Sequence, residues 1–255
     1  LFRSEPLGFN HHPNVETMKT ENTVLHKADT RGRADYGWLK TNYSFSFANY
    51  YNPDRMHFGA LRVLNDDFIA AGMGFSTHPH DNMEIISIPL SGNLVHRDSM
   101  GNEKIIRQGD IQIMSAGTGI EHSEFNYNKD KDVQFLQIWI FPKIRNITPA
   151  YDQKTFSRDE RINSIQQIVS PDKQGKCIHI NQQAWISLCT LSPGKSIEYS
   201  IHAENNGVYI FLIEGEIKFQ DIQIKRRDGL GIWETDSIFL ESVGDAEILL
   251  LEVPM

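Results

Sequence analysis

The feature that most constrains this chain is the form of its apolar segments, which are short, closely spaced and rich in β-branched and aromatic residues. Examples are MEIISIPL (83–90), VQFLQIWIF (133–141), GVYIFLIEG (207–215) and EILLLEVP (247–254), with Gly, Pro, Asn and Asp between the segments. Apolar runs of roughly four to eight residues are typical of strands, and turns at close spacing favour a sandwich or a barrel. We therefore expect an all-β fold.

One stretch of the chain departs from this pattern. Residues 142–176 are polar, contain three prolines and include the best candidate for a helix, at roughly residues 157–169. We interpret this change in composition as a boundary. The expected organisation is an N-terminal domain over residues 18–142, a linker over residues 143–176 and a C-terminal domain over residues 177–255.

The two halves of the chain also resemble each other. The segment IPLSGNLVH (88–96) matches FLIEGEIKF (211–219) at an offset of 123 residues, since both place a glycine turn between two strand-like runs. Further along, RQGDIQIM (107–114) matches RDGLGIWE (227–234) at an offset of 120 residues. Two successive matches at a nearly constant offset predict a duplicated domain.

Charge and hydropathy exclude several classes of protein. The chain has 25 Lys and Arg against 33 Asp and Glu, a formal net charge of −8, and no dense basic run. A duplex-binding surface needs a basic patch, so we expect no direct nucleic-acid partner. No apolar run approaches the ~18 residues needed to span a bilayer, so we expect no membrane association.

The N-terminal segment and the two cysteines bear on location. Residues 1–17, which include His11 and His12, lack the apolar region of a secretory signal, and we expect an extension or a flexible arm. Cys177 and Cys189 lie in apolar, strand-like surroundings, which predicts two buried or half-buried thiols rather than a disulfide. The expected location is the cytoplasm.

Two pairs of metal-ligating residues carry the chemistry. His78 and His80 flank Pro79, and His122 and Glu124 are likewise two residues apart, so each pair projects from one face of a strand. Proline cannot donate to a sheet, which predicts a strand end or an edge strand there. Three imidazoles and one carboxylate suit Fe(II), Mn, Ni, Cu or Zn better than Ca or Mg. Four such ligands leave two open positions on an octahedral metal, which favours a catalytic site over a closed structural one.

The glycines around these pairs extend the pattern to a family. Gly72 precedes His78 by six residues, and Gly109, Gly117 and Gly119 precede His122. This spacing resembles the two motifs of the cupin superfamily, and residues 78–126 resemble the core of the pirin family. Residues 31–67, the segment DGLGIWE and the C-terminal EILLLEVP resemble other parts of pirins, so the resemblance covers roughly residues 19–255.

The resemblance implies a bicupin, with two β-barrel domains and one Fe(II) in the N-terminal domain. Another divalent metal (Mn, Ni, Cu, Zn or Co) is the alternative. Matched to this sequence, the ligands are His78, His80, His122 and Glu124. Glu84, which stands where many other cupins place their carboxylate, is the second candidate ligand, or else a partner that orients a histidine.

The same offsets applied to the C-terminal half predict a barrel without metal. The positions that would carry ligands hold Ile201, Ala203, Ser242 and Gly244 instead. We therefore expect His179 and His202 to be ordinary histidines.

Three further positions complete the site predictions. His96 precedes an expected hairpin turn at residues 98–102, and a hydrogen bond that holds this hairpin is the favoured role over metal binding. Asn42 and Asp81 stand where pirins commonly have His and Arg, and Asp81 would add negative charge near the mouth of the pocket.

Three functions follow from this reading. The first is a quercetin 2,3-dioxygenase-like enzyme, which would bind a flavonol or a similar enolisable aromatic together with O₂ and use Glu124 as general base. The second is an iron-dependent regulatory protein that binds a protein partner without turnover, as the resemblance to pirin co-regulators implies. The third is a β protein in which the metal is structural.

Overall fold

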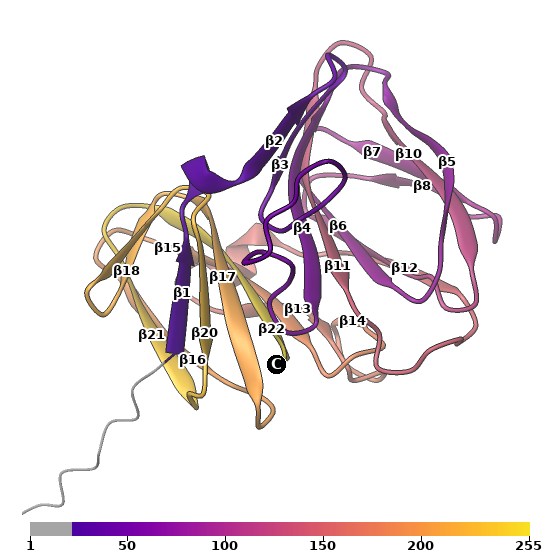
Figure 1. The fold of residues 1–255 in the computed structure, drawn as a ribbon. Helices are drawn as coiled ribbons and strands as arrows, with labels where there is room; N and C mark the ends of the chain where they lie inside the picture. Colours follow the sequence, from indigo (N-terminus) through magenta and orange to yellow (C-terminus); the bar gives the residue numbers. More distant parts are fainter. Residues whose placement is uncertain (1–21) are drawn as a thin grey trace, which may run out of the picture.

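The structure is a computed structural model that describes residues 22–255, and the arm expected over residues 1–17 lies outside this range. Two β-barrels lie side by side, each formed by one large and one small sheet whose strands are antiparallel except for a short parallel pair in the C-terminal barrel (Figure 1). The predicted all-β fold of two barrels is confirmed.

Both cysteines are free, Cys189 buried and Cys177 half-buried, as expected. In the described part of the chain no helix has the length and apolarity that crossing a bilayer requires.

The N-terminal barrel pairs a seven-stranded sheet with a four-stranded one. The order of the large sheet is β12-β9-β6-β11-β4-β3-β2 and that of the small sheet is β5-β10-β7-β8. The strands are β2 (Gly32–Asp35), β3 (Leu39–Tyr43), β4 (Leu61–Ile69), β5 (Gly74–His80), β6 (Glu84–Ser91), β7 (Leu94–Asp98), β8 (Glu103–Ile106), β9 (Asp110–Ser115), β10 (Ile120–Asn126), β11 (Val133–Ile140) and β12 (Ala150–Thr155).

The C-terminal barrel repeats this plan. Its large sheet has the order β1-β20-β17-β22-β15-β13-β14 and its small sheet β16-β21-β18-β19. The strands are β1 (Asn22–His26), β13 (Gln166–Ser170), β14 (Ile178–His179), β15 (Trp185–Leu191), β16 (Ser196–Ser200), β17 (Asn206–Glu214), β18 (Glu216–Phe219), β19 (Ile222–Lys225), β20 (Gly229–Trp233), β21 (Ser237–Ser242) and β22 (Ala246–Pro254).

The two large sheets pack against each other and bury the core between the domains. Leu64, Ile86 and Ile138 of the N-terminal sheet belong to one buried cluster with Phe211 and Leu249 of the C-terminal sheet. The central strands are therefore buried on both faces. This explains why segments such as EIISIPL and EILLLEV are continuously apolar instead of alternating.

Two expectations about domain organisation need correction. Residues 143–176 do not form a simple linker, because β12 pairs with β9 of the N-terminal barrel and β13 pairs with β15 of the C-terminal barrel. Strand β1 precedes the N-terminal barrel in sequence, yet it pairs with β20 of the C-terminal one. The chain therefore crosses between the domains at both places.

The helix expected over residues 157–169 is wrong. This segment forms a short 3-10 helix η2 (Arg158–Arg161) and then enters β13; the other 3-10 helix is η1 (Ala28–Thr30). Ile168 and Val169 are fully buried in the sheet. Pairing with β15 therefore overrides the weak helical spacing of the apolar residues.

Candidate metal centre

Three of the four predicted ligands meet on two neighbouring strands of the small N-terminal sheet. Strand β5 carries His78 and His80, and its antiparallel neighbour β10 carries His122 directly opposite His78. Strand β5 lies at the edge of this sheet, as the proline at position 79 predicts. The alternation of side chains along β5 turns both histidines toward the barrel interior.

The ring nitrogens of these histidines converge on one point. His122 Nε2 lies 3.0 Å from His78 Nε2 and 3.1 Å from His80 Nε2. Two nitrogens bound to one metal at ~2.1 Å are about 3.0 Å apart at right angles and about 3.4 Å apart at the tetrahedral angle. The observed spacing therefore fits adjacent positions of an octahedral metal.

The second ring nitrogen of His78 fixes the tautomer that metal binding requires. His78 Nδ1 lies 2.8 Å from the backbone oxygen of Ser76, which only a protonated Nδ1 can satisfy. Nε2 of His78 is then left with a free lone pair. Such a contact orients the ring and strengthens the imidazole as a ligand.

Burial keeps two of these histidines, His80 and His122, in the neutral form. Burial, together with the neighbouring histidines, lowers the pKa of His80 to about 4 and that of His122 to about 3. Asp81, exposed at the end of β5, opposes the shift at His80. Neutral imidazoles are the form that binds a metal, so at neutral pH His80 and His122 are in the form that a metal requires.

Glu124 lies beside this group but is held by other partners. Its Oε1 accepts a hydrogen bond from Ser87 Oγ at 2.9 Å, and its Oε2 accepts one from Gln137 Nε2 at 2.6 Å. The three histidines form one candidate metal group without it, whereas Glu124 groups with His96 and His122 within 4.8 Å. Glu124 is thus a buried carboxylate adjacent to the histidines.

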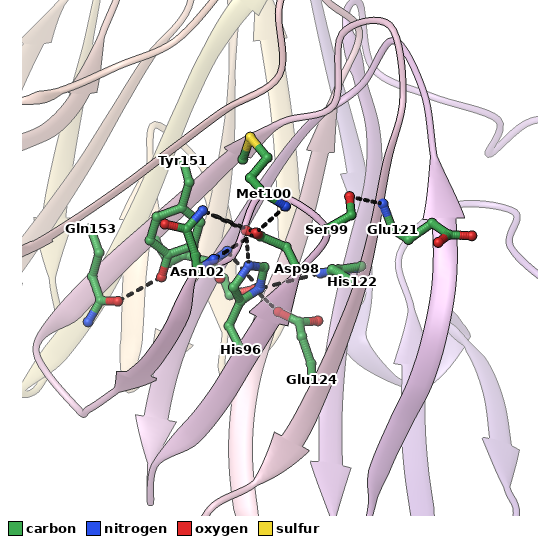
Figure 2. A network of polar contacts seen from close by, with 12 residues as sticks. His96, Asp98, Ser99, Met100, Asn102, Glu121, His122, Glu124, Tyr151 and Gln153 are labelled. Carbon is green, nitrogen blue, oxygen red and sulfur yellow. Dashed lines mark hydrogen bonds and ion pairs between the residues drawn. The ribbon is translucent and has the colours of Figure 1, made fainter.

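His96 connects His122 to a hairpin. His96 Nε2 donates to Asp98 Oδ2 at 2.8 Å, and His96 Nδ1 lies 3.5 Å from His122 Nδ1 (Figure 2). Asp98 also accepts hydrogen bonds from the backbone of Met100 and from Asn102. Burial alone would raise the pKa of Asp98, but the hydrogen bonds from His96 and Asn102 outweigh it and lower the pKa. The predicted hydrogen bond between His96 and its hairpin is present.

Glu84 faces away from the histidines, which argues against both of its predicted roles. Its Oε2 accepts hydrogen bonds from Ser115 Oγ at 2.8 Å and from the backbone nitrogen of Asn181 at 3.1 Å. Asn181 follows β14 in the C-terminal barrel. Side chains alternate along β6, so Glu84 points to the domain interface while Ser87 points into the barrel.

A row of polar side chains opposite the histidines was missing from the sequence-based prediction. It crosses the large sheet in register through five neighbouring strands, and its members are Tyr43, Asn65, Gln137, Ser87 and Gln112. All five are buried. The signal that identifies them is a single polar residue inside an otherwise apolar strand, such as Ser87 in EIISIPL.

A pocket of about 240 Å³ opens beside the metal centre. His78, His80 and Glu124 lie on one side of it and the strands β3 and β4 on another. Its apolar lining comes from Leu39, Tyr43, Phe47, Phe75 and Trp139. Among residues 22–255, the C-terminal barrel has no cluster of His, Cys, Asp and Glu side chains that could hold a metal. His202 in this barrel contacts Glu252 Oε2 at 2.7 Å.

Comparison with known proteins places this architecture in a family. A sequence model described as Pirin matches residues 23–140, and one described as the quercetinase C-terminal cupin domain matches residues 167–253. A quercetin 2,3-dioxygenase from Escherichia coli (strain K12) is 41% identical over 230 residues, which cover 90% of this chain and 98% of that protein. The chain belongs to the pirin family.

Further pirins agree in sequence and in structure. A pirin-like protein from Caulobacter vibrioides is 36% identical, over 88% of this chain and 96% of its own length. The crystal structure of a bacterial pirin from Escherichia coli in complex with nickel(II) matches with a TM-score of 0.86 at 39% identity, and the match covers 91% of this chain and 99% of that one. The prediction of two cupin domains is therefore confirmed.

Proposed function

We propose that this pirin is a metal-dependent dioxygenase of the quercetin 2,3-dioxygenase type, with His78, His80, His122 and Glu124 as ligands of Fe(II). The observation that carries the proposal is the convergence of three imidazole nitrogens at 3.0 and 3.1 Å beside an aromatic-lined pocket. The names of the relatives support the reaction class. The nickel(II) complex of the Escherichia coli pirin supports a site that also accepts other divalent metals.

The substrate class is a flavonol or a similar enolisable aromatic that reacts with O₂. A divalent metal in this site would act as a Lewis acid on two neighbouring substrate oxygens. Aromatic side chains such as Phe47 and Trp139 would hold the planar rings and exclude water. The pocket volume is just below the ~300 Å³ at which ligand pockets usually begin, which favours a small planar ligand.

Glu124 is suited to accept the proton of the enolic hydroxyl. Its carboxylate lies on the wall of the pocket. The hydrogen bonds from Ser87 and Gln137 fix its orientation, so that a proton can be received at a defined position. A carboxylate that uses one oxygen as a ligand keeps the other for the proton.

The test is release of CO and uptake of O₂ when Fe(II)-loaded protein is given quercetin. We expect turnover by the wild type and by His202→Ala, which alters a histidine in the C-terminal barrel. We expect at least a 100-fold loss in His80→Ala, because one ligand is removed. Absence of CO release from wild type that holds one Fe(II) per chain would overturn the proposal.

A further inference from the structure

Two buried oxygens on the pocket wall have no hydrogen-bond partner. Asn65 Oδ1 and Asp67 Oδ1 are shielded from solvent, and neither has a partner among residues 22–255. Both residues line the pocket beside the metal centre. A buried polar atom without a partner costs about 1–3 kcal/mol, so most native proteins avoid it.

Asn65 and Asp67 lie on the face of β4 that is turned toward the pocket. Asp66 lies between them on β4 and points to the opposite face, where Arg31, Arg227 and Gln134 all contact its carboxylate. Within the described part of the chain, Asp67 forms no ion pair of this kind. The neighbouring aspartates therefore differ: Asp66 belongs to an ion-pair network between the domains, whereas Asp67 lies on the wall of the pocket with its Oδ1 unpartnered.

Ionisation of Asp67 at this buried position also costs free energy. Burial raises the pKa of Asp67 to about 7; a hydrogen bond from Thr41 on the adjacent strand opposes this shift without satisfying Oδ1, and the charges of Asp66 and Glu124 add to it. Glu124 has a donor on each oxygen, so only Asp67 is left unsatisfied among the two carboxylates of the pocket. The missing partner is a hydrogen-bond donor.

We propose that Asn65 and Asp67 form a recognition site for hydroxyl groups on the part of the substrate that is remote from the metal. This inference rests on the proposed function, because the metal centre fixes the other end of the ligand. Substrates would then be phenols that carry a chelating oxygen pair on one ring and donor hydroxyls on another. A site built to receive a hydroxyl rejects an analogue that lacks it, because its own polar atoms stay unpaired.

The experiment compares two flavonols that share the chelating oxygen pair and differ in their other hydroxyl groups. Quercetin has them, whereas 3-hydroxyflavone keeps the chelating pair alone. Dissociation constants are measured under nitrogen on protein loaded with Zn(II), which has no redox chemistry, so that the readout is binding and not turnover. The variants are Asn65→Leu and Asp67→Leu, whose new side chains have nearly the same shape as the old ones.

We expect the wild type to bind quercetin at least about tenfold more tightly than 3-hydroxyflavone. Each variant should reduce this ratio to within about threefold, with little change in the affinity for 3-hydroxyflavone. Asp66→Asn is the matched control, since its side chain faces the other domain, and it should keep the wild-type ratio. One bound Zn(II) per chain verifies that each variant is folded.

Equal binding of the two flavonols by the wild type, or a ratio that survives in both Leu variants, would overturn the inference and leave the proposed function intact. Failure of Zn(II)-loaded wild type to bind either flavonol would overturn both. The two failures are therefore distinguishable.

Discussion

At the scale of single residues, the metal centre is shaped by groups that do not contact the metal position. Gln137 donates from Nε2 to Glu124, and its own Oε1 accepts a hydrogen bond from Trp139 Nε1 at 3.2 Å. One amide thus fixes both the carboxylate and an aromatic wall of the pocket. Partners of this kind decide how well a ligand is presented.

Replacement of Gln137 by Met should weaken metal binding by about 10- to 100-fold, because Glu124 loses the donor on Oε2. Gln134→Met is the control: it lies on the same strand, faces the other way and contacts Asp66. Competition with a chelator of known affinity measures the effect. Equal affinities of Gln137→Met and the wild type would show that Glu124 needs no such support.

Asp67→Asn should stabilise the metal-free protein, most strongly above pH 7. The pKa of Asp67 in the folded state is raised from 3.8 to about 7. As the pH rises from 4 to 8, the wild type therefore loses folding free energy, because its carboxyl ionises less readily in the folded state than in the unfolded state. The neutral amide of the variant does not ionise, so its stability does not fall in this way. We expect a gain of ~1–3 kcal/mol in the free energy of unfolding at pH 8, and little gain at pH 4. Urea unfolding at both pH values tests this; a gain of equal size at pH 4 would contradict it.

At the scale of elements, the hairpin of β7 and β8 contacts the candidate metal centre through His96, which lies next to His122. Asp98 ends β7 and accepts hydrogen bonds from His96, from the backbone nitrogens of Met100 and Asn102, and from the Asn102 side chain. The ring of Tyr151 on β12 packs over His96 with a centroid distance of 4.8 Å. The hairpin therefore positions His96, and through it His122.

Asp98→Ala should lower the free energy of unfolding by ~2 kcal/mol or more, because it leaves the buried His96 ring and the turn donors of Met100 and Asn102 without their acceptor. Ser99→Ala in the same turn removes only the contact with the backbone nitrogen of Glu121 and should cost less than ~1 kcal/mol. Chemical unfolding of the metal-free proteins gives both values. Similar losses in the two variants would contradict the central position of Asp98.

The sequence was sufficient to predict the strands, the two barrels and the paired histidines, because each rests on local spacing. The partners of the strands depend on distant segments. Nothing in NTVLH indicates that β1 joins the other barrel, and residues 166–170 satisfy a helical spacing as well as a strand. Glu84 was misassigned because the sequence does not reveal which face of a strand meets the second domain. The unpaired state of Asp67 is visible only in three dimensions.

At the scale of the whole molecule, a buried ion-pair network joins the barrels next to the site. Arg227 of the C-terminal barrel lies 3.2 Å from Asp66 of the N-terminal barrel and 3.2 Å from Glu214 of its own. Arg31, which follows the crossing strand β1, lies 3.2 Å from the same aspartate. The strand that carries these contacts, β4, also carries Asn65 and Asp67, so the domain interface and the pocket share one element.

Arg227→Met should destabilise the protein by ~1–3 kcal/mol, because the buried carboxylate of Asp66 loses one of its two cations and keeps only Arg31. The neighbouring Arg226→Met removes only an exposed contact with Glu214 and should cost less than ~1 kcal/mol. Because the domains share one buried core, unfolding should occur in a single transition in both variants. Two separate transitions in Arg227→Met would show that the barrels fold independently.

The most direct measurement is the number and affinity of divalent ions bound by the metal-free protein, in titrations with Fe(II) under nitrogen. We predict one ion per chain in the wild type and in His202→Ala, and binding at least about 100-fold weaker in His80→Ala and His122→Ala, which lose a ligand. If His80→Ala and His122→Ala bind one Fe(II) as tightly as the wild type, the three converging histidines are not the metal centre and the account is wrong.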